Sequence, residues 1–427
     1  MSVHLNRNQK TQTLFKQLID GILVAFPFID LFLFRYSFIL FPGPLGYGPL
    51  ICMYVLLPIW MVRYAFPTKL VLALVAIALM GGSGVLTGIV NTFDFFKVWG
   101  GLVLSSTYYW YLWHHLQKDY LRGFQLYANG CVIVSIFGLL IFIDAIVPFG
   151  FHAFANSIIN VAYVKGDLGI RVASTFGEPT YFATVVAPSS VFALRSLFVV
   201  GYNENHREVQ LNKWQSLTIL IALALTFSTV AFAGIAIAAA MLFFRAKSTK
   251  SRIGLVTSSL ILAWSAMQTN DIAARVNSFR LDNIAIADMH GSSAILYNHF
   301  HIATQQAKEN PLFGGGLCSH PLATERFSIL RGTDLDVIYN KNNQDASSMF
   351  LRLLSEFGLF GVLGLLSFLF IYRPSTRHHY FREIAWVCFI SIALQLFRQG
   401  NFVLHGFPFF LIAYALLPCR EDNHTIL

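Results

Sequence analysis

Arg171 and Glu178 flank a short segment of small and polar residues, and Pro179 follows at once. Proline is common in the first turn of a helix, where its missing N–H costs nothing. The free N–H groups of a helix start, with an arginine nearby, suit an anionic group such as a phosphate. Glu178 has the chemistry of a general base. An interfacial Arg–Glu pair that only closes a loop would leave the same pattern.

A second charged pair, Arg352 and Glu356, is spaced so that both side chains lie on one face of a helix. The pair falls near the outer end of an apolar segment, 346–371. Charges at such a position are expensive unless they face water or protein. The pattern therefore predicts either a substrate-binding pair or a structural ion pair between helices.

A glycine run, Gly314 to Gly316, follows Asn310-Pro311 at the end of a predicted helix over 293–309. Backbone N–H groups in such a run can cradle phosphate oxygens. The run lacks the lysine and hydroxyl of a nucleotide P-loop. Gly314 and Gly316 are therefore candidate substrate-binding residues, and a flexible turn is the alternative.

The glycine run lies inside a polar segment, 268–345, that is rich in arginine and histidine. Arg275 and Arg280 could each hold phosphate oxygens with the bidentate guanidinium fork. As lone surface arginines they would simply be solvated. His290 is a second candidate for the general base, after Glu178.

Apolar segments long enough to cross a bilayer core must position these residues. The apolar fraction is 56% and the charged fraction 12%, which exclude an ordinary soluble globular protein. We predict an all-α polytopic membrane protein of about twelve transmembrane helices, forming one integral membrane domain, 1–427. Segment 215–245 is interpreted as two short helices that meet near Ser228, or else as one long tilted helix. The predicted apolar cores are 15–34, 45–62, 70–90, 97–113, 124–147, 180–199, 215–230, 231–245, 253–268, 346–371, 384–398 and 403–419.

The distribution of basic residues orients the chain. With the N-terminus in the cytoplasm, more than half of the 30 lysine and arginine residues fall on the cytoplasmic side. Both termini are then cytoplasmic, and two long loops, 148–175 and 268–345, face the external or periplasmic side, the larger one between the ninth and tenth helices. The net charge of +9 is mostly a topology signal, so no nucleic-acid partner is predicted.

Metal and disulfide chemistry find little support. His299 and His301 are two residues apart, which does not place them on one helix face. Cys318 is the one cysteine predicted in a periplasmic loop, so an internal periplasmic disulfide is not expected. We predict no metal and no other cofactor.

Four segments carry a resemblance to a known family. Residues 171–179 read Arg-x-x-Ser-x-Phe-x-Glu-Pro, and 226–234 lie at the turn between two apolar segments. Residues 310–316 read Asn-Pro-Leu-Phe-Gly-Gly-Gly, and 347–361 hold two serines and then Glu-x-Gly-x-x-Gly. In this order, over about 165–365, they resemble the O-antigen polymerase and O-antigen ligase-related family of bacterial polysaccharide assembly.

The sequence departs from this family's pattern at three positions. Thr229 and Leu296 stand where an arginine is common, and Ser347 stands where the ligases have a histidine that is their favoured catalytic base. The missing histidine favours the polymerase branch over ligation to lipid A–core.

The resemblance implies a bacterial inner-membrane glycosyltransferase that joins polyprenyl-diphosphate-linked oligosaccharide repeat units at the periplasmic face. Arg171, with Arg280 or Arg275, would hold the diphosphate, whose developing charge fixed cations stabilise. Glu178 or His290 would be the base. The product would be O-antigen, capsule or exopolysaccharide, and the partners would be the bilayer and, in the same pathway, a chain-length regulator and a flippase.

Two other functions remain open at this point. One is ligase-type transfer of the finished polymer to another acceptor. The other is transport or flipping of lipid-linked oligosaccharides, which would place charged residues near the membrane midplane. The charged candidates here gather near the outer ends of the predicted spans, which favours an enzyme.

Overall fold

The fold is a bundle of helices with one small hairpin. A computed structural model describes residues 2–33, 48–65, 67–116, 119–158, 161–166, 169–199, 208–267, 291–332, 343–373, 379–404 and 406–417. The helices are α1 (Ser2–Phe32), α2 (Gly48–Arg63), α3 (Thr68–Gly81), α4 (Ser83–Leu86), α5 (Thr92–His115), α6 (Tyr120–Ile146), α7 (Phe151–Ile158), α8 (Pro179–Val186), α9 (Ser190–Phe198), α10 (Lys213–Ala224), α11 (Thr229–Phe243), α12 (Thr249–Met267), α14 (Gly291–Glu309), α15 (His320–Phe327), α16 (Met349–Ile371), α17 (His379–Arg398) and α18 (Phe407–Leu416).

Every predicted apolar core overlaps a helix of the structure. Among the described residues, four helical stretches are long and apolar enough to cross a membrane: Thr68–Leu86, Tyr120–Ile146, Pro179–Phe198 and Met349–Ile371. These apolar helices indicate a membrane protein, whereas the count of twelve spans stays a prediction. The prediction of two short helices in 215–245 is confirmed, because α10 ends at Ala224 and Ser228 caps the start of α11.

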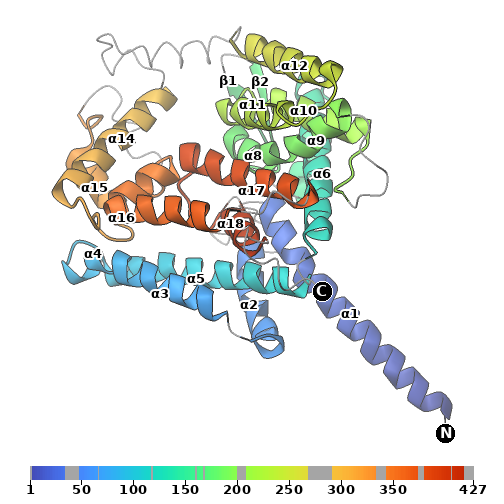
Figure 1. Cartoon of the computed structure of the whole chain (residues 1–427), viewed down its shortest axis with the longest axis horizontal. Helices are drawn as coiled ribbons and strands as arrows, with labels where there is room; N and C mark the ends of the chain where they lie inside the picture. The colour runs from blue at the N-terminus through green and yellow to red at the C-terminus, as the bar shows by residue number, and fades with distance from the viewer. Residues whose placement is uncertain are drawn as a thin grey trace.

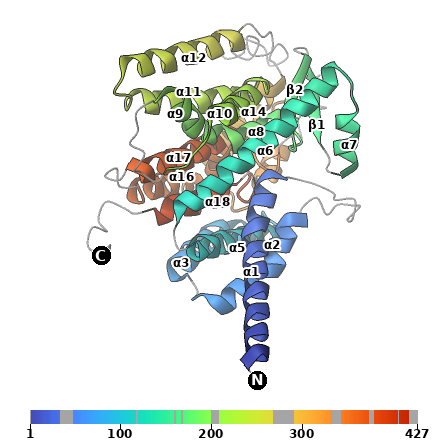
Figure 2. The ribbon, with the colours of Figure 1, turned by 90° about the vertical axis from the view of Figure 1, so that its right-hand side faces the viewer.

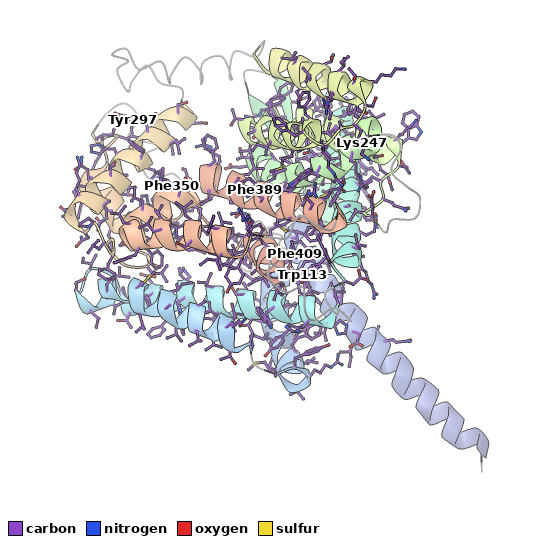
Figure 3. All side chains as sticks on the ribbon, in the orientation of Figure 1. Trp113, Lys247, Tyr297, Phe350, Phe389 and Phe409 are labelled. Carbon is purple, nitrogen blue, oxygen red and sulfur yellow. The ribbon has the colours of Figure 1, made fainter. Side chains whose placement is uncertain are left out.

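The helices stack in layers (Figure 1). Helices α3 and α5 run side by side below α16 and α17, α10 to α12 lie above them, and α14 and α15 close one end. Helix α18 sits in the middle, where the ring of Phe409 lies 5.1 Å from that of Trp113 on α5 and 5.6 Å from that of Phe124 on α6 (Figure 3). Buried aromatic pairs of this kind fix the relative positions of the helices that carry them.

The prediction of an all-α fold is wrong at one place. Within the predicted loop 148–175, α7 is followed by an antiparallel hairpin of β1 (Ala162–Gly166) and β2 (Gly169–Ser174). Figure 2 shows the hairpin and α7 at one end of α6. The end of β2 is buried, and the Ser174 hydroxyl donates to the carbonyl of Val134 on α6. The segment forms a strand because its backbone groups pair with β1 while its last residues pack on the bundle.

Candidate functional site

A cavity of about 960 Å³ is surrounded by the N-terminal parts of several helices. Its lining comes from the N-terminal halves of α2, α5, α8, α15 and α16 and from the segments just before α5, α16 and α18. The N-terminal ends of helices attract anions, because their N–H groups and dipoles point outward. The charged residues in the lining are Asp94, Lys97, Glu178, Asp345 and Arg352.

Helix α16, whose Arg352 lines this cavity, is broken at Gly358. Gly358 has φ 59° and ψ −151° inside the helix, a conformation that only glycine adopts readily. The carbonyls of Ser355 and Glu356 accept from the N–H groups of Gly315 and Gly316, both at 2.9 Å. The carbonyls left without a partner by the break thus receive hydrogen bonds from the glycine run, as an apolar environment requires of every backbone group.

The part of α16 that follows the break also finds hydrogen-bond partners for its first backbone N–H groups. The N–H of Leu359 donates to the carbonyl of Pro311 at 2.9 Å, and the N–H of Phe360 donates to that of Leu312 at 3.1 Å. Two of the four motif segments identified in the sequence, 310–316 and 347–361, are therefore joined backbone to backbone.

The glycine run packs tightly against its neighbours. A Cβ on Gly314 would lie 2.6 Å from the backbone of Glu356 and Phe357, and one on Gly316 would lie 2.4 Å from the backbone N of Gly84. The N–H of Gly314 donates to Asn310, and those of Gly315 and Gly316 donate to α16. These N–H groups are thus engaged within the protein, and neither Gly314 nor Gly316 lines the cavity.

Arg352 and Glu356 form a buried ion pair on α16. The Nε of Arg352 donates to Oε1 of Glu356 at 3.1 Å, and its Nη1 donates to the carbonyl of Gly400 at 2.9 Å. The guanidinium also lies 4.2 Å from the centre of the Phe402 ring. Arg352 lines the cavity, whereas Glu356 lies behind it, and its Oε2 has no hydrogen-bond partner among the described residues.

Arg171 joins two other motif segments. Its Nε donates to the carbonyl of Thr226 at 3.0 Å, and its Nη2 donates to that of Phe227 at 3.2 Å. The adjacent N–H of Val172 donates to Leu225 at 3.0 Å. The arginine thus ties the end of the hairpin to the turn between α10 and α11. It is not in the cavity lining, whereas Glu178, which precedes α8 directly, is.

The segment that enters α16 is strained. Ala346 and Ser347 both have positive φ, 54° and 56°, and the N–H of Ser347 donates to Oδ1 of Asp345 at 3.0 Å. Ser348 caps α16 by accepting from Leu351, and its hydroxyl donates to the carbonyl of Leu396. This turn presents Asp345 to the cavity.

Strain of this kind gathers at the motif segments. The non-glycine residues with positive φ in the described ranges all fall within the four segments or at most two residues from one of them: Ser174, Phe227, Cys318, Ala346 and Ser347. Such conformations cost about 1–3 kcal/mol each and persist where surrounding contacts enforce them, often at functional sites. This clustering supports a functional role for the four segments.

Three buried residues that are distant in the sequence, His299, His320 and Ser355, form a hydrogen-bonded chain. The Nε2 of His320 lies 3.0 Å from Nδ1 of His299 on α14, and its Nδ1 lies 3.0 Å from the hydroxyl of Ser355 on α16. Burial holds the pKa of His320 well below its usual value, and the neighbouring His299 and Arg352 lower it further. The ring is therefore neutral, donating at one nitrogen and accepting at the other.

Asp94, Lys97 and Cys318 were also missed by sequence reasoning. The Cys318 thiol donates to the carbonyl of Asp94 at 3.4 Å. Burial raises the pKa of this thiol to about 12; the carboxylates of Glu356 and Asp94 add to the rise, while Arg352 and Lys97 oppose it. Four charges thus surround one thiol, although no local pattern in the sequence connects them.

Three predicted site residues, Arg275, Arg280 and His290, lie outside the described residues. Within the described ranges, no group of three or more histidine, cysteine or acidic residues is placed to hold a metal ion.

One part of the chain is similar to a known protein family. Residues 215–366 match the model of a family described as O-antigen ligase. This part of the chain is similar to the O-antigen ligase and polymerase-related family. A search of curated proteins finds no match.

The part that matches the O-antigen ligase family runs from α10 into α16 and includes the glycine run and the helix break. It contributes Cys318, Asp345 and Arg352 to the cavity. The opposite walls come from outside the match: Asp94 and Lys97 belong to α5, and Glu178 precedes α8. The candidate site is therefore completed by a region that the family match does not cover.

Proposed function

We propose that this chain is a polymerase that joins polyprenyl-diphosphate-linked oligosaccharide repeat units at the periplasmic face of the bacterial inner membrane. The family match supports an enzyme of the O-antigen ligase and polymerase type in polysaccharide assembly. The observation that carries the finer proposal is the cavity, whose lining contains a buried arginine, Arg352, and a carboxylate, Glu178, together with helix N-termini.

The reaction needs an acceptor hydroxyl, a lipid-linked donor and a base. The hydroxyl oxygen attacks C1 of the donor sugar, the bond between C1 and the phosphate oxygen breaks, and polyprenyl diphosphate leaves with the electron pair. The hydroxyl proton passes to the carboxylate of Glu178. The charge that develops on the leaving diphosphate is stabilised by Arg352 and by the helix N-termini.

Arg352 takes the role in this mechanism that the sequence suggested for Arg171. The guanidinium of Arg171 donates to two carbonyls of the α10–α11 turn, which supports a positioning role. Ser347, at the position of the ligase histidine, is not a base near neutral pH, and this supports polymerisation over ligation. The charged lining residues belong to the outer ends of the predicted spans, whereas transporters place their charged residues near the membrane midplane, and this favours an enzyme over a transporter.

Reconstitution tests the proposal directly. The full chain in lipid nanodiscs is given a polyprenyl-diphosphate-linked repeat unit as its one substrate, and the products are separated by size. Polymerisation gives a ladder of longer glycans that remain on the lipid carrier. Transfer of preformed polymer to a separate acceptor, with no lengthening of the carrier-linked glycan, would replace the polymerase proposal with the ligase alternative.

A deletion strain gives an independent answer in the cell. Loss of a polymerase leaves single repeat units, free on the carrier or attached to core, and removes the long-chain ladder. Accumulation of long polymer on the lipid carrier would show that another protein polymerises, and the ligase alternative would again replace our proposal.

A further inference from the structure

Arg352 retains one guanidinium nitrogen, Nη2, that can donate to a ligand. Its side chain is only 6% exposed. The Nε and Nη1 atoms donate to Glu356 and to the carbonyl of Gly400, and one face of the guanidinium covers the Phe402 ring. Nη2 makes no hydrogen bond with any described residue, although the side chain lines the cavity. A buried guanidinium held on three sides is preorganised to donate from the fourth.

Lys97 is the second cation of the same cavity. It lies near the start of α5, is exposed, and forms no ion pair or hydrogen bond with any residue in the described ranges. Its charge and that of Arg352 both act on the Cys318 thiol, so the two cations lie within electrostatic reach of one point. The two side chains come from α5 and α16, on different walls of the cavity.

The other charged residues of the cavity are acidic, so the binding of an anion depends on these two cations. Asp94, Glu178 and Asp345 also line the cavity, and like charges repel an entering anion. A diphosphate carries two phosphate groups, so one cation on each wall can pair with one group each. A single phosphate needs only one of them.

We propose that Lys97 and Arg352 together bind the two phosphates of a lipid diphosphate, so that α5 supplies half of the leaving-group site. This inference rests on the proposed function, which it deepens by naming the second cation. It also predicts selectivity: a prenyl diphosphate binds more tightly than the monophosphate, and the uncharged prenol binds most weakly.

The test is equilibrium binding to the full chain in nanodiscs, with geranylgeranyl diphosphate, geranylgeranyl monophosphate and geranylgeraniol as probes. Lys97→Met removes the charge at an exposed position where the fold does not depend on it. We expect it to weaken diphosphate binding by about tenfold or more, which corresponds to about 1.4 kcal/mol, and to leave the binding of the prenol within about twofold. Lys97→Arg should restore most of the affinity.

Lys69→Met is the matched control, because Lys69 is an exposed lysine at the start of another helix, α3, and is not in the cavity lining. It should bind all three probes like the wild type. Added salt should weaken diphosphate binding more steeply in the wild type than in Lys97→Met, because one ionic contact has been removed.

Wild-type affinity for diphosphate in Lys97→Met, or equal affinity of the wild type for diphosphate and monophosphate, would overturn the two-cation site. Failure of the proposed function looks different. In that case the wild type binds the diphosphate through Lys97 but makes no longer glycan from lipid-linked repeat units. Conversely, polymerisation that proceeds with Lys97 irrelevant to binding leaves the function standing and removes this site.

Discussion

The backbone N–H of Gly315 donates to the carbonyl of Ser355 at 2.9 Å, across the break in α16. In an unbroken helix, this carbonyl would accept from Leu359, whose N–H is instead donated to Pro311. The loop before α15 therefore substitutes for one turn of a helix that is long and apolar enough to cross a membrane. This exchange holds Arg352 and Glu356 just before the break.

Gly358→Ala tests the importance of the break. Gly358 has positive φ, and a Cβ there would lie 2.7 Å from the backbone of Leu312 and Gly314. We expect a loss of stability of at least about 1–3 kcal/mol from backbone strain alone, with loss of polymer formation. The thermal unfolding midpoint of the purified chain in detergent measures the first effect, and the glycan ladder measures the second.

Gly364→Ala provides the control for this substitution, because Gly364 lies in the same helix and nothing is within 4 Å of its added Cβ. It should keep wild-type stability or gain slightly, since alanine favours helices. Equal behaviour of the two variants would mean that the break does not constrain the fold.

Arg171→Ala should remove polymer while leaving single repeat units and normal protein levels. The structure adds a second expectation. Because Nε and Nη2 of Arg171 hold the carbonyls of Thr226 and Phe227, diphosphate binding should stay within about threefold of wild type, a change of less than about 0.7 kcal/mol. Arg171→Lys should recover only part of the activity, because lysine lacks the two-pronged fork.

A large loss of diphosphate affinity in Arg171→Ala would return this arginine to the role of phosphate ligand. Full polymer length in the same variant would remove it from the mechanism altogether. The two readouts together separate positioning from direct binding.

Local patterns in the sequence were sufficient to predict the positions of individual helices. The helix expected over 293–309 is confirmed as α14, Gly291–Glu309, and Pro179 is confirmed as the first residue of α8. Both follow from signals that lie within one or two turns of the chain. The hairpin was missed because its stability depends on burial of β2 against α6, which no local pattern reveals.

The candidate site could be predicted only in part, because it depends on contacts between distant segments. Glu178 and Arg352 were singled out from their own neighbourhoods and do line the cavity. Lys97 was not singled out, since its relevance comes from a wall formed by α5, far along the chain from Arg352. His320 was missed for the same reason, because its two partners lie on separate helices.

Glu178→Gln should reduce the rate of polymer formation by about a hundredfold or more if this carboxylate accepts the proton. Glu325→Gln is the control, because Glu325 is exposed on α15 and is not in the cavity lining. Ser347→Ala should be tolerated, since the hydrogen bond to Asp345 uses the backbone N–H that alanine keeps. The rate of ladder formation in nanodiscs measures all three. Normal rates in Glu178→Gln would reassign the base.

The buried His320 predicts how stability depends on pH. Its pKa in the folded chain is well below the usual value, mainly because of burial and also because of His299 and Arg352. Above about pH 6.5, the pKa of a free histidine, the His320 ring is neutral in both the folded and the unfolded state, so it does not reduce the free energy of unfolding. As pH falls below this value, the unfolded state gains a proton that the folded state resists, so stability is lost, by at most about 1.4 kcal/mol per pH unit.

His320→Gln should flatten this dependence, since glutamine does not titrate. We expect the thermal midpoint of the wild type to fall more between pH 7 and pH 5 than that of the variant. His301 lies two residues from His299 but outside the hydrogen-bonded chain of His299, His320 and Ser355. His301→Gln should therefore retain the wild-type dependence of the thermal midpoint on pH. The same slope in His320→Gln as in the wild type would show that other groups, rather than this histidine, set the acid sensitivity of the fold.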